Sequence, residues 1–249
     1  TNGLTKQYGH QKAVDKVNLH IKKGAIYGFI GRNGAGKTTC LKMISGLARP
    51  TAGEIEMFGC KGKELERIRS RVGCLIEAPG LYGNMNAYTN LKIKCELFGI
   101  RKKGYIEDIL ETVGLEGVGK KKTKHFSLGM KQRLGIGLAL VGEPDLLVLD
   151  EPINGLDPQG IAEVRDTIQR LRDERNMTIL ISSHILEELS KIATDYGIIH
   201  NGSLLQELTS EELMKRCSER IEIELVHPEQ AVPILDRMGF TNYQVTDKS

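Results

Sequence analysis

Residues 31–39 have the sequence GRNGAGKTT. They follow an apolar run, residues 25–30, which we expect to form a buried strand. The spacing from Gly31 to Thr38 is GxxxxGK[ST], the phosphate-binding loop. Its glycines let backbone N–H groups converge on phosphate oxygens, and the helix that follows points the positive end of its dipole at the negative charge. The sequence therefore predicts a nucleotide-phosphate site between a strand and a helix.

Two side chains of this loop have predicted chemical roles. Lys37 is placed to reach the β- and γ-phosphates, and the hydroxyl of Thr38 is expected to bind Mg²⁺. The predicted nucleotide-binding residues of the loop are Gly31, Asn33, Gly34, Gly36, Lys37, Thr38 and Thr39. The alternative is a glycine-rich turn without a ligand, but a predicted strand before the loop and a helix after it argue against that alternative.

A second motif, LLVLDEP at residues 146–152, leads an apolar strand directly into two acids. Open α/β sheets bind ligands at the carboxyl ends of their strands, so Asp150 is expected to support Mg²⁺ there. Glu151 is placed to orient or deprotonate the attacking water, which makes it the predicted catalytic base. A helix cap or surface turn is the alternative for this stretch taken alone.

Short apolar runs alternate with helical patterns along the chain, which predicts an α/β fold with a mostly parallel sheet. Strand signals are absent between about residues 80 and 142, so we expect an inserted helical subdomain there. The pair Asn201-Gly202 is typical of a hairpin turn, which would add an antiparallel edge. We expect a main domain over residues 1–218 and, over residues 219–249, the start of a small, truncated βαβ appendage.

The composition excludes several classes of protein. The chain has 249 residues, 40% hydrophobic residues and a net charge of only +3, which favours a globular protein and gives no case for a nucleic-acid partner. Its five cysteines lack CxxC spacing, which argues against a disulfide framework and against a zinc site. We find no signal peptide and no run long enough for a membrane span. The first residue is not Met and the last lies in mid-pattern, so we expect further residues at both ends.

Three more motifs narrow the class of phosphate-loop NTPase. They are FSLGMKQR at residues 126–133, INGLDP at residues 153–158 and ILISSHILEE at residues 179–188. In this order and spacing they resemble the signature motif, D-loop and switch histidine of ATP-binding cassette (ABC) ATPases. The resemblance extends from about Leu4 to Cys217 and implies a RecA-like P-loop NTPase core.

The resemblance implies a head-to-tail homodimer that encloses two Mg²⁺-ATP. By position, Ser127 and Gly129 would contact the γ-phosphate across the dimer, where the helix dipole favours negative charge. His184 would hold the γ-phosphate, Asp157 would link the two sites, and Tyr8 would stack on adenine. The alternatives are ordinary structural roles, such as a helix cap for Ser127 and a core or surface position for Tyr8.

Three positions depart from the common family pattern. Leu128 replaces glycine and Met130 replaces glutamine in the signature, and Glu77 replaces the glutamine that usually contacts Mg²⁺ and water. A carboxylate beside ATP adds repulsion unless a metal or a proton offsets it. Glu77 and the signature form resemble the bacitracin- and lantibiotic-type exporter ATPases. We expect Glu77 to ligate the metal or to serve coupling to a membrane subunit.

The leading hypothesis is an ATPase subunit at the cytoplasmic face of the cell membrane that drives a separate polytopic permease, exporting an antimicrobial peptide or drug. The alternatives are a non-transport ABC ATPase that acts on ribosomes or DNA, and a binding module with little turnover. The basic run at residues 119–124, GKKKTK, is most simply a solvated face, and attraction to anionic lipid is the second interpretation.

Overall fold

The computed structural model describes residues 1–216 and 228–239, and it divides into two units, Thr1–Leu213 and Met214–Ser249. In the second unit the described residues end helix α7 (Ser210–Arg216) and form helix α8 (Pro228–Arg237). The predicted domain boundary at residue 218 and the predicted strands of the appendage lie outside the described residues.

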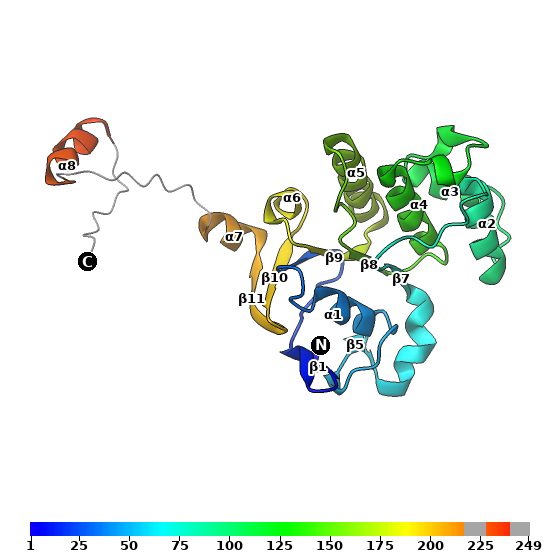
Figure 1. Cartoon of the computed structure of the whole chain (residues 1–249), viewed down its shortest axis with the longest axis horizontal. Coiled ribbons are helices and arrows are strands. Elements are labelled where there is room, and N and C mark those ends of the chain that lie inside the picture. Colours follow the sequence, from blue (N-terminus) through cyan, green and yellow to red (C-terminus); the bar gives the residue numbers. More distant parts are fainter. Residues whose placement is uncertain (217–227, 240–249) are drawn as a thin grey trace. The chain divides into compact units, whose positions relative to one another are not determined.

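A six-stranded sheet organises the first unit, in the order β11-β10-β3-β9-β8-β7 (Figure 1). All neighbouring pairs are parallel except β10 and β11. The mostly parallel sheet and antiparallel edge predicted from the sequence are confirmed. The strands are β3 (Ile26–Ile30), β7 (Val72–Leu75), β8 (Leu146–Asp150), β9 (Thr178–Ser183), β10 (Asp195–His200) and β11 (Ser203–Thr209).

The central strands are apolar because both faces of the sheet are covered. Every residue of β8 and β9 is buried. Side chains alternate between the faces, so Leu147 and Leu149 join the core on one side, whereas Leu146 and Val148 join the core on the other. The acids of residues 150 and 151 therefore lie at the end of a strand that is held from two sides.

Helices form one of these layers. Figure 1 shows α5 and the helices of the range 80–142 on the same side of the sheet, and α4 contacts both α5 and β7. The helices are α2 (Ala87–Leu97), α3 (Tyr105–Thr112), α4 (Leu128–Leu140), α5 (Pro158–Arg175) and α6 (Leu186–Ser190), with short 3₁₀ turns η2 (Glu116–Val118) and η3 (Thr123–His125). Within the described residues, no helix is both long and apolar enough to cross a bilayer.

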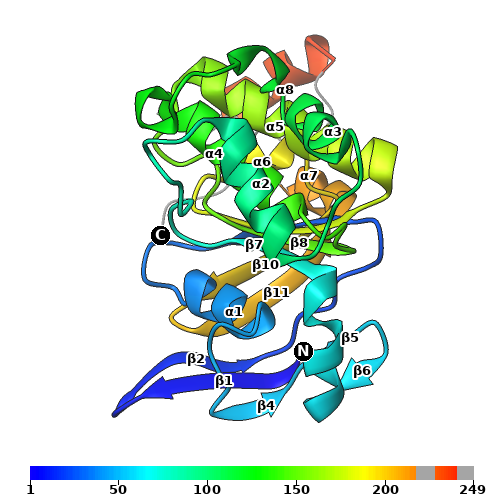
Figure 2. The same ribbon diagram turned by 90° about the vertical axis from the view of Figure 1, so that its right-hand side faces the viewer.

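The other layer consists of helix α1 (Lys37–Ile44) and a small antiparallel sheet (Figure 2). That sheet has the order β2-β1-β4 and shares a core with α1 and the large sheet. The sequence did not predict the long 3₁₀ helix η1. The remaining elements are β1 (Asn2–Tyr8), β2 (Gln11–Val17), β4 (Ala52–Glu54), the hairpin of β5 (Glu56–Met57) and β6 (Cys60–Lys61), and η1 (Gly62–Arg71).

The predicted hairpin turn joins β10 to β11. Asn201 and Gly202 have φ of 46° and 80°, the left-handed values that a two-residue type I′ turn requires, and His200 pairs with Ser203 across it. The tip also makes contacts far away in the sequence. Gly202 N donates to Ala35 O at 2.9 Å, and Gly202 O accepts from Asp15 N at 2.8 Å.

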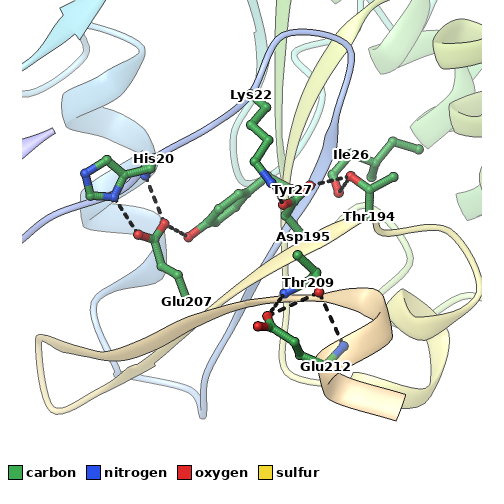
Figure 3. A network of polar contacts seen from close by, with 9 residues as sticks. All are labelled: His20, Lys22, Ile26, Tyr27, Thr194, Asp195, Glu207, Thr209 and Glu212. Carbon is green, nitrogen blue, oxygen red and sulfur yellow. Dashed lines mark hydrogen bonds and ion pairs between the residues drawn. The ribbon is translucent and has the colours of Figure 1, made fainter. Parts of the chain in front are cut away.

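A polar network connects the segment before β3 with the β10–β11 hairpin (Figure 3). The Glu207 carboxylate accepts hydrogen bonds from Tyr27 Oη at 2.5 Å and from His20 N at 2.9 Å, and Lys22 pairs with Asp195 at 2.7 Å. Burial, together with the bond to Glu207, raises the pKa of Tyr27, so the phenol stays protonated. The network fixes the start of the strand that ends in the phosphate loop.

Candidate active site

The phosphate loop connects β3 to α1. Gly36 has φ of 105° and precedes the first helical residue, and a Cβ there would lie 2.5 Å from Ala13 O. A side chain at this position would therefore be strained and would collide with backbone. The first turn of α1 contains no acid, so no carboxylate of the helix itself offsets the positive dipole end and the free N–H groups that suit an anion.

Lys37 is buried, with 5% of its surface exposed. Its ammonium donates to Gly31 O at 2.6 Å and to Arg32 O at 3.2 Å, and it lies 3.1 Å from Glu151 Oε1. Burying a charge is costly unless it is paired and hydrogen-bonded, and these three oxygens offset that cost. They also hold the lysine over the loop that the sequence predicts will bind phosphate.

Asp150 links the loop to the neighbouring strand. Its Oδ2 accepts from Thr38 Oγ1 at 2.8 Å, and its Oδ1 accepts from Ser182 Oγ at 2.7 Å. Ser182 lies directly opposite Asp150 in the parallel register of β8 and β9 and also accepts from Glu151 N at 2.9 Å. One buried serine thus orients both acids.

Glu151 follows β8 in a left-handed conformation with φ of 48°, a conformation that non-glycine residues adopt rarely. Its Oε2 lies 2.8 Å from His184 Nδ1, so a protonated Nδ1 donates to the carboxylate. Its Oε1 is buried and accepts no hydrogen bond among the described residues, although the Lys37 ammonium lies 3.1 Å away. Beyond this ion pair the oxygen has no hydrogen bond within the described chain, so it is placed to accept a proton of water.

The oxygens of Thr38 and Asp150 fit Mg²⁺, which prefers one or two carboxylates together with substrate phosphates and water. Among the residues described, no three His, Cys, Asp or Glu side chains gather in a metal-binding group. A dedicated cage such as a zinc site needs more such ligands. The donor set therefore suits a cation that arrives with a nucleotide.

Two of the residues that are predicted to act across the dimer interface cap helices in the single chain. Ser127 Oγ accepts from Met130 N at 3.2 Å at the start of α4, and Asp157 Oδ1 accepts from Gly160 N at 3.0 Å at the start of α5. Gly129 lies close to α5, since a Cβ there would be 3.3 Å from the Cα of Gly160. Within the described chain none of the predicted trio, Ser127, Gly129 and Asp157, has a hydrogen bond or ion pair to the phosphate loop.

The remaining predicted residues lie around the loop. Tyr8 is the last residue of β1 and is 54% exposed. The Lys6 ammonium lies 5.0 Å from the centroid of its ring. Asn33 is exposed and Thr39 is half-buried. Leu128, the departure from glycine in the signature, is 48% exposed. An exposed aromatic ring and an exposed loop remain accessible to a nucleotide.

Glu77 contacts a residue that the sequence analysis missed. Its Oε1 lies 2.5 Å from Lys42 Nζ, and its backbone has φ of 64°. The hydrogen bond to Glu77 raises the pKa of Lys42, with smaller contributions from Tyr8 and Asp150. A lysine thus provides the counter-charge for the glutamate that replaces the usual glutamine, and the predicted metal role of Glu77 stays a prediction.

Both missed residues had weak signals in the sequence. Ser182 lies two residues before His184 in the motif ILISSHILEE, and Lys42 lies one helical turn after Thr38 on the same face of α1. Neither signal predicts which residue the side chain contacts, because the contacted residues are distant in the sequence.

Known proteins that resemble this chain are ATP-binding proteins of transporters, in agreement with a site built around a phosphate loop. The ABC transporter family model matches residues 14–154. The bacitracin transport ATP-binding protein BcrA of Bacillus licheniformis is 50% identical over 95% of this chain and 78% of its own length. The lantibiotic transport ATP-binding protein SrtF of Streptococcus pyogenes is 45% identical over 82% of this chain and 87% of its own length.

Solved structures share the fold. An ATP-binding subunit of an ABC transporter has a TM-score of 0.75 with 28% identity, over 94% of this chain and 98% of that one. A dimeric ATP-binding cassette in a post-hydrolysis state with ADP and Pi has a TM-score of 0.73 with 24% identity, over 84% and 97%. With the loop, the two acids and the histidine in contact, these matches establish that the chain belongs to the ABC transporter family, as an ATP-hydrolysing ATP-binding protein.

Proposed function

We propose that this chain is the ATPase subunit of an exporter that removes an antimicrobial peptide or a drug and thereby confers resistance. The observation that supports catalysis best is the continuous set of contacts from Lys37 through Glu151 to His184, with Asp150 on Thr38 beside it. A domain that only binds nucleotide has no need of a buried carboxylate placed between the phosphate-loop lysine and a histidine.

In the proposed reaction each residue has one task. The loop N–H groups and Lys37 bind the phosphates, and Glu151 accepts the proton of the attacking water through Oε1. His184 holds the carboxylate through Oε2 and, by family resemblance, contacts the γ-phosphate. Thr38 and Asp150 would hold Mg²⁺, which neutralises charge on the phosphates when bound.

We propose that two copies assemble head to tail, so that each ATP also meets Ser127 and Gly129 of the opposite copy. The exposure of Ser127 at the N-terminus of α4 supports this arrangement, and the neighbouring Leu128 is also exposed, whereas Gly129 is buried in the single chain. The dimeric cassette among the structural relatives provides the precedent. Glu151→Gln is expected to accumulate as an ATP-bound dimer, which light scattering measures.

The proposed partner is a separate polytopic membrane protein, which places the chain at the cytoplasmic face of the membrane. Support comes from the relatives, which are named as bacitracin and lantibiotic transport ATP-binding proteins. Glu77 is proposed to serve coupling to this partner. If Glu77→Gln left the ATPase rate, its Mg²⁺ dependence and transport unchanged, this role would be excluded.

The deciding experiment is to purify the tagged chain from detergent-solubilised membranes of its host and identify what accompanies it. We expect a polytopic membrane protein that raises the Mg²⁺-dependent ATPase rate, and bacitracin resistance that requires both proteins and is lost in Glu151→Gln. Recovery with ribosomes or DNA instead would favour a non-transport ABC ATPase. ATP binding with no hydrolysis, even with the partner, would favour a binding module.

A further inference from the structure

Helices α4 and α5 lie side by side (Figure 1). Ser127, at the start of α4, and Asp157, at the start of α5, are both exposed. Near these starts Gly129 packs against Gly160, since a Cβ at Gly129 would lie 3.3 Å from the Cα of Gly160. The residues that are expected to act on the opposite copy of the dimer are therefore presented by two closely packed helices.

One side chain connects these helices to each other and to α3. Arg133 lies on α4 with 11% of its side chain exposed, and its Nη2 lies 2.8 Å from Glu163 Oε2 on α5. Its Nη1 donates to Val113 O at 3.1 Å and to Gly114 O at 2.6 Å, where α3 ends. A cation is favoured at the C-terminus of a helix. The guanidinium thus fixes α4 from two directions.

Glu163 extends the connection to the D-loop. Its Oε1 accepts from Gln159 Nε2 at 3.0 Å, and Gln159 lies two residues after Asp157. The opposite face of α5 is held by the core, in which Val164 and Ile168 are fully buried. A continuous set of polar contacts therefore joins the signature helix to the start of α5, and α5 is itself anchored on the sheet.

Stability alone is a weak explanation for this ion pair. The cost of removing two charges from water often exceeds their attraction, so a buried ion pair can be replaced by apolar side chains at little loss. Arg133 Nε is also buried and has no hydrogen bond within the described part of the chain, which adds to the cost. A planar guanidinium does, however, fix the geometry of its partners in a way that an apolar contact cannot.

We infer that Arg133 and Glu163 are positioning residues that hold the signature segment and the D-loop as one body. Ser127 and Asp157 then reach the opposite copy together, in one fixed arrangement. In the described residues neither Arg133 nor Glu163 has a hydrogen bond or ion pair to the phosphate loop, so they act on hydrolysis through the helices that they join. The inference rests on the head-to-tail dimer of the proposed function.

The test compares Arg133→Met, Glu163→Leu and the two changes together. The matched control is Arg175→Met, because Arg175 pairs with Asp108 of α3 at 2.9 Å from the other end of α5, about 18 Å along the helix from Glu163. For each chain we would measure kcat and KM for ATP, binding of a fluorescent ATP analogue, and urea unfolding. Light scattering in a Glu151→Gln background would report dimerisation with ATP.

We expect kcat to fall about tenfold in each single variant, because a small misplacement of trans-acting groups is costly. The double variant should fall no further, since both changes break the same connection. Binding of the ATP analogue should match the parent, whereas dimerisation should require a higher chain concentration. The control should keep the parent kcat.

Two comparisons separate positioning from a purely structural role. The double variant should recover most of the free energy of unfolding that each single variant loses, yet keep its low kcat. Arg133→Lys retains the charge and should recover part of the rate. Glu163→Gln keeps the shape of the side chain but has a single acceptor oxygen, and it replaces Glu163→Leu if the apolar variant does not fold.

Two results would overturn the inference alone. One is a parent-like kcat and dimerisation in the double variant, and the other is an equal loss of kcat in Arg175→Met, which would indicate a general loosening of α5. If the Glu151→Gln chain does not dimerise with ATP even with Arg133 and Glu163 in place, the head-to-tail proposal is wrong and this inference is wrong with it.

Discussion

Glu151 Oε1 and Lys37 Nζ lie 3.1 Å apart, so the residue assigned to the attacking water and the residue assigned to the phosphates form an ion pair. The lysine also donates to two backbone carbonyls. A γ-phosphate therefore competes with the Glu151 carboxylate for the same ammonium. Removing the charge of this carboxylate should change both ATP binding and ATP hydrolysis.

The first prediction concerns Glu151→Gln. Because glutamine keeps the shape but cannot accept the proton of water, ATP hydrolysis should fall by about a hundredfold or more. ATP affinity should hold or increase, since the competing negative charge is gone. Phosphate release and binding of a fluorescent ATP analogue measure the two effects, with the exposed Glu66→Gln as control. A variant that keeps half of the parent rate would remove Glu151 from the role of base.

The second prediction concerns the pair of Lys42 and Glu77, which are 2.5 Å apart. Lys42→Met leaves the Glu77 carboxylate without its counter-charge, so affinity for the anionic nucleotide should fall about fivefold. Glu77→Gln in the same chain should restore most of it. The four proteins form a double-mutant cycle, read by nucleotide binding. Strictly additive effects would mean that the contact is unimportant for binding.

The third prediction compares two adjacent buried serines of β9. Ser182→Ala removes the donor to Asp150 and the acceptor of Glu151 N, so it should lower the free energy of unfolding by about 1–3 kcal/mol and raise the Mg²⁺ concentration needed for half-maximal ATPase rate. Ser183→Ala is the control, because within the described part of the chain the hydrogen bonds of its hydroxyl are with Ile185 alone. An unchanged Mg²⁺ requirement in Ser182→Ala would show that the serine has only a structural role.

The fourth prediction concerns alkaline pH. Burial in α1 raises the pKa of Cys40 from 9.0 to about 12. The folded chain thus keeps a proton that the unfolded chain loses, so stability from this thiol is complete below about pH 9 and is lost as the pH rises toward about 12. The slope is about 1.4 kcal/mol per pH unit. Urea unfolding from pH 7.5 to 11 should show a shallower fall in Cys40→Ala than in the parent, and parallel curves would contradict the assignment.

Most elements were predictable because their signals are local, and the same holds for the motifs whose side chains the structure brings into contact, Lys37, Thr38, Asp150, Glu151 and His184. An apolar run that ends in two acids predicts a buried strand with Asp150 at its end, and Asn201-Gly202 predicts the turn that the structure has. The sequence did not predict which strands lie beside each other in the sheet, or in which register. Ser182 orients both acids only because β9 lies beside β8 in one particular register. The contact between Lys42 and Glu77 likewise depends on where α1, which packs on β8, lies relative to the segment that follows β7.

The tip of the β10–β11 hairpin has a consequence for the use of ATP energy. Gly202 is bonded on one side to Ala35 in the phosphate loop and on the other side to Asp15 of β2. The loop is therefore bonded to the hairpin tip, which is in turn bonded to β2, and less ordering is left for the nucleotide to impose on the loop. A phosphate loop that is already ordered uses little of the binding free energy to fold around its ligand. In the proposed exporter, that free energy remains available for moving the two copies and the membrane partner relative to each other.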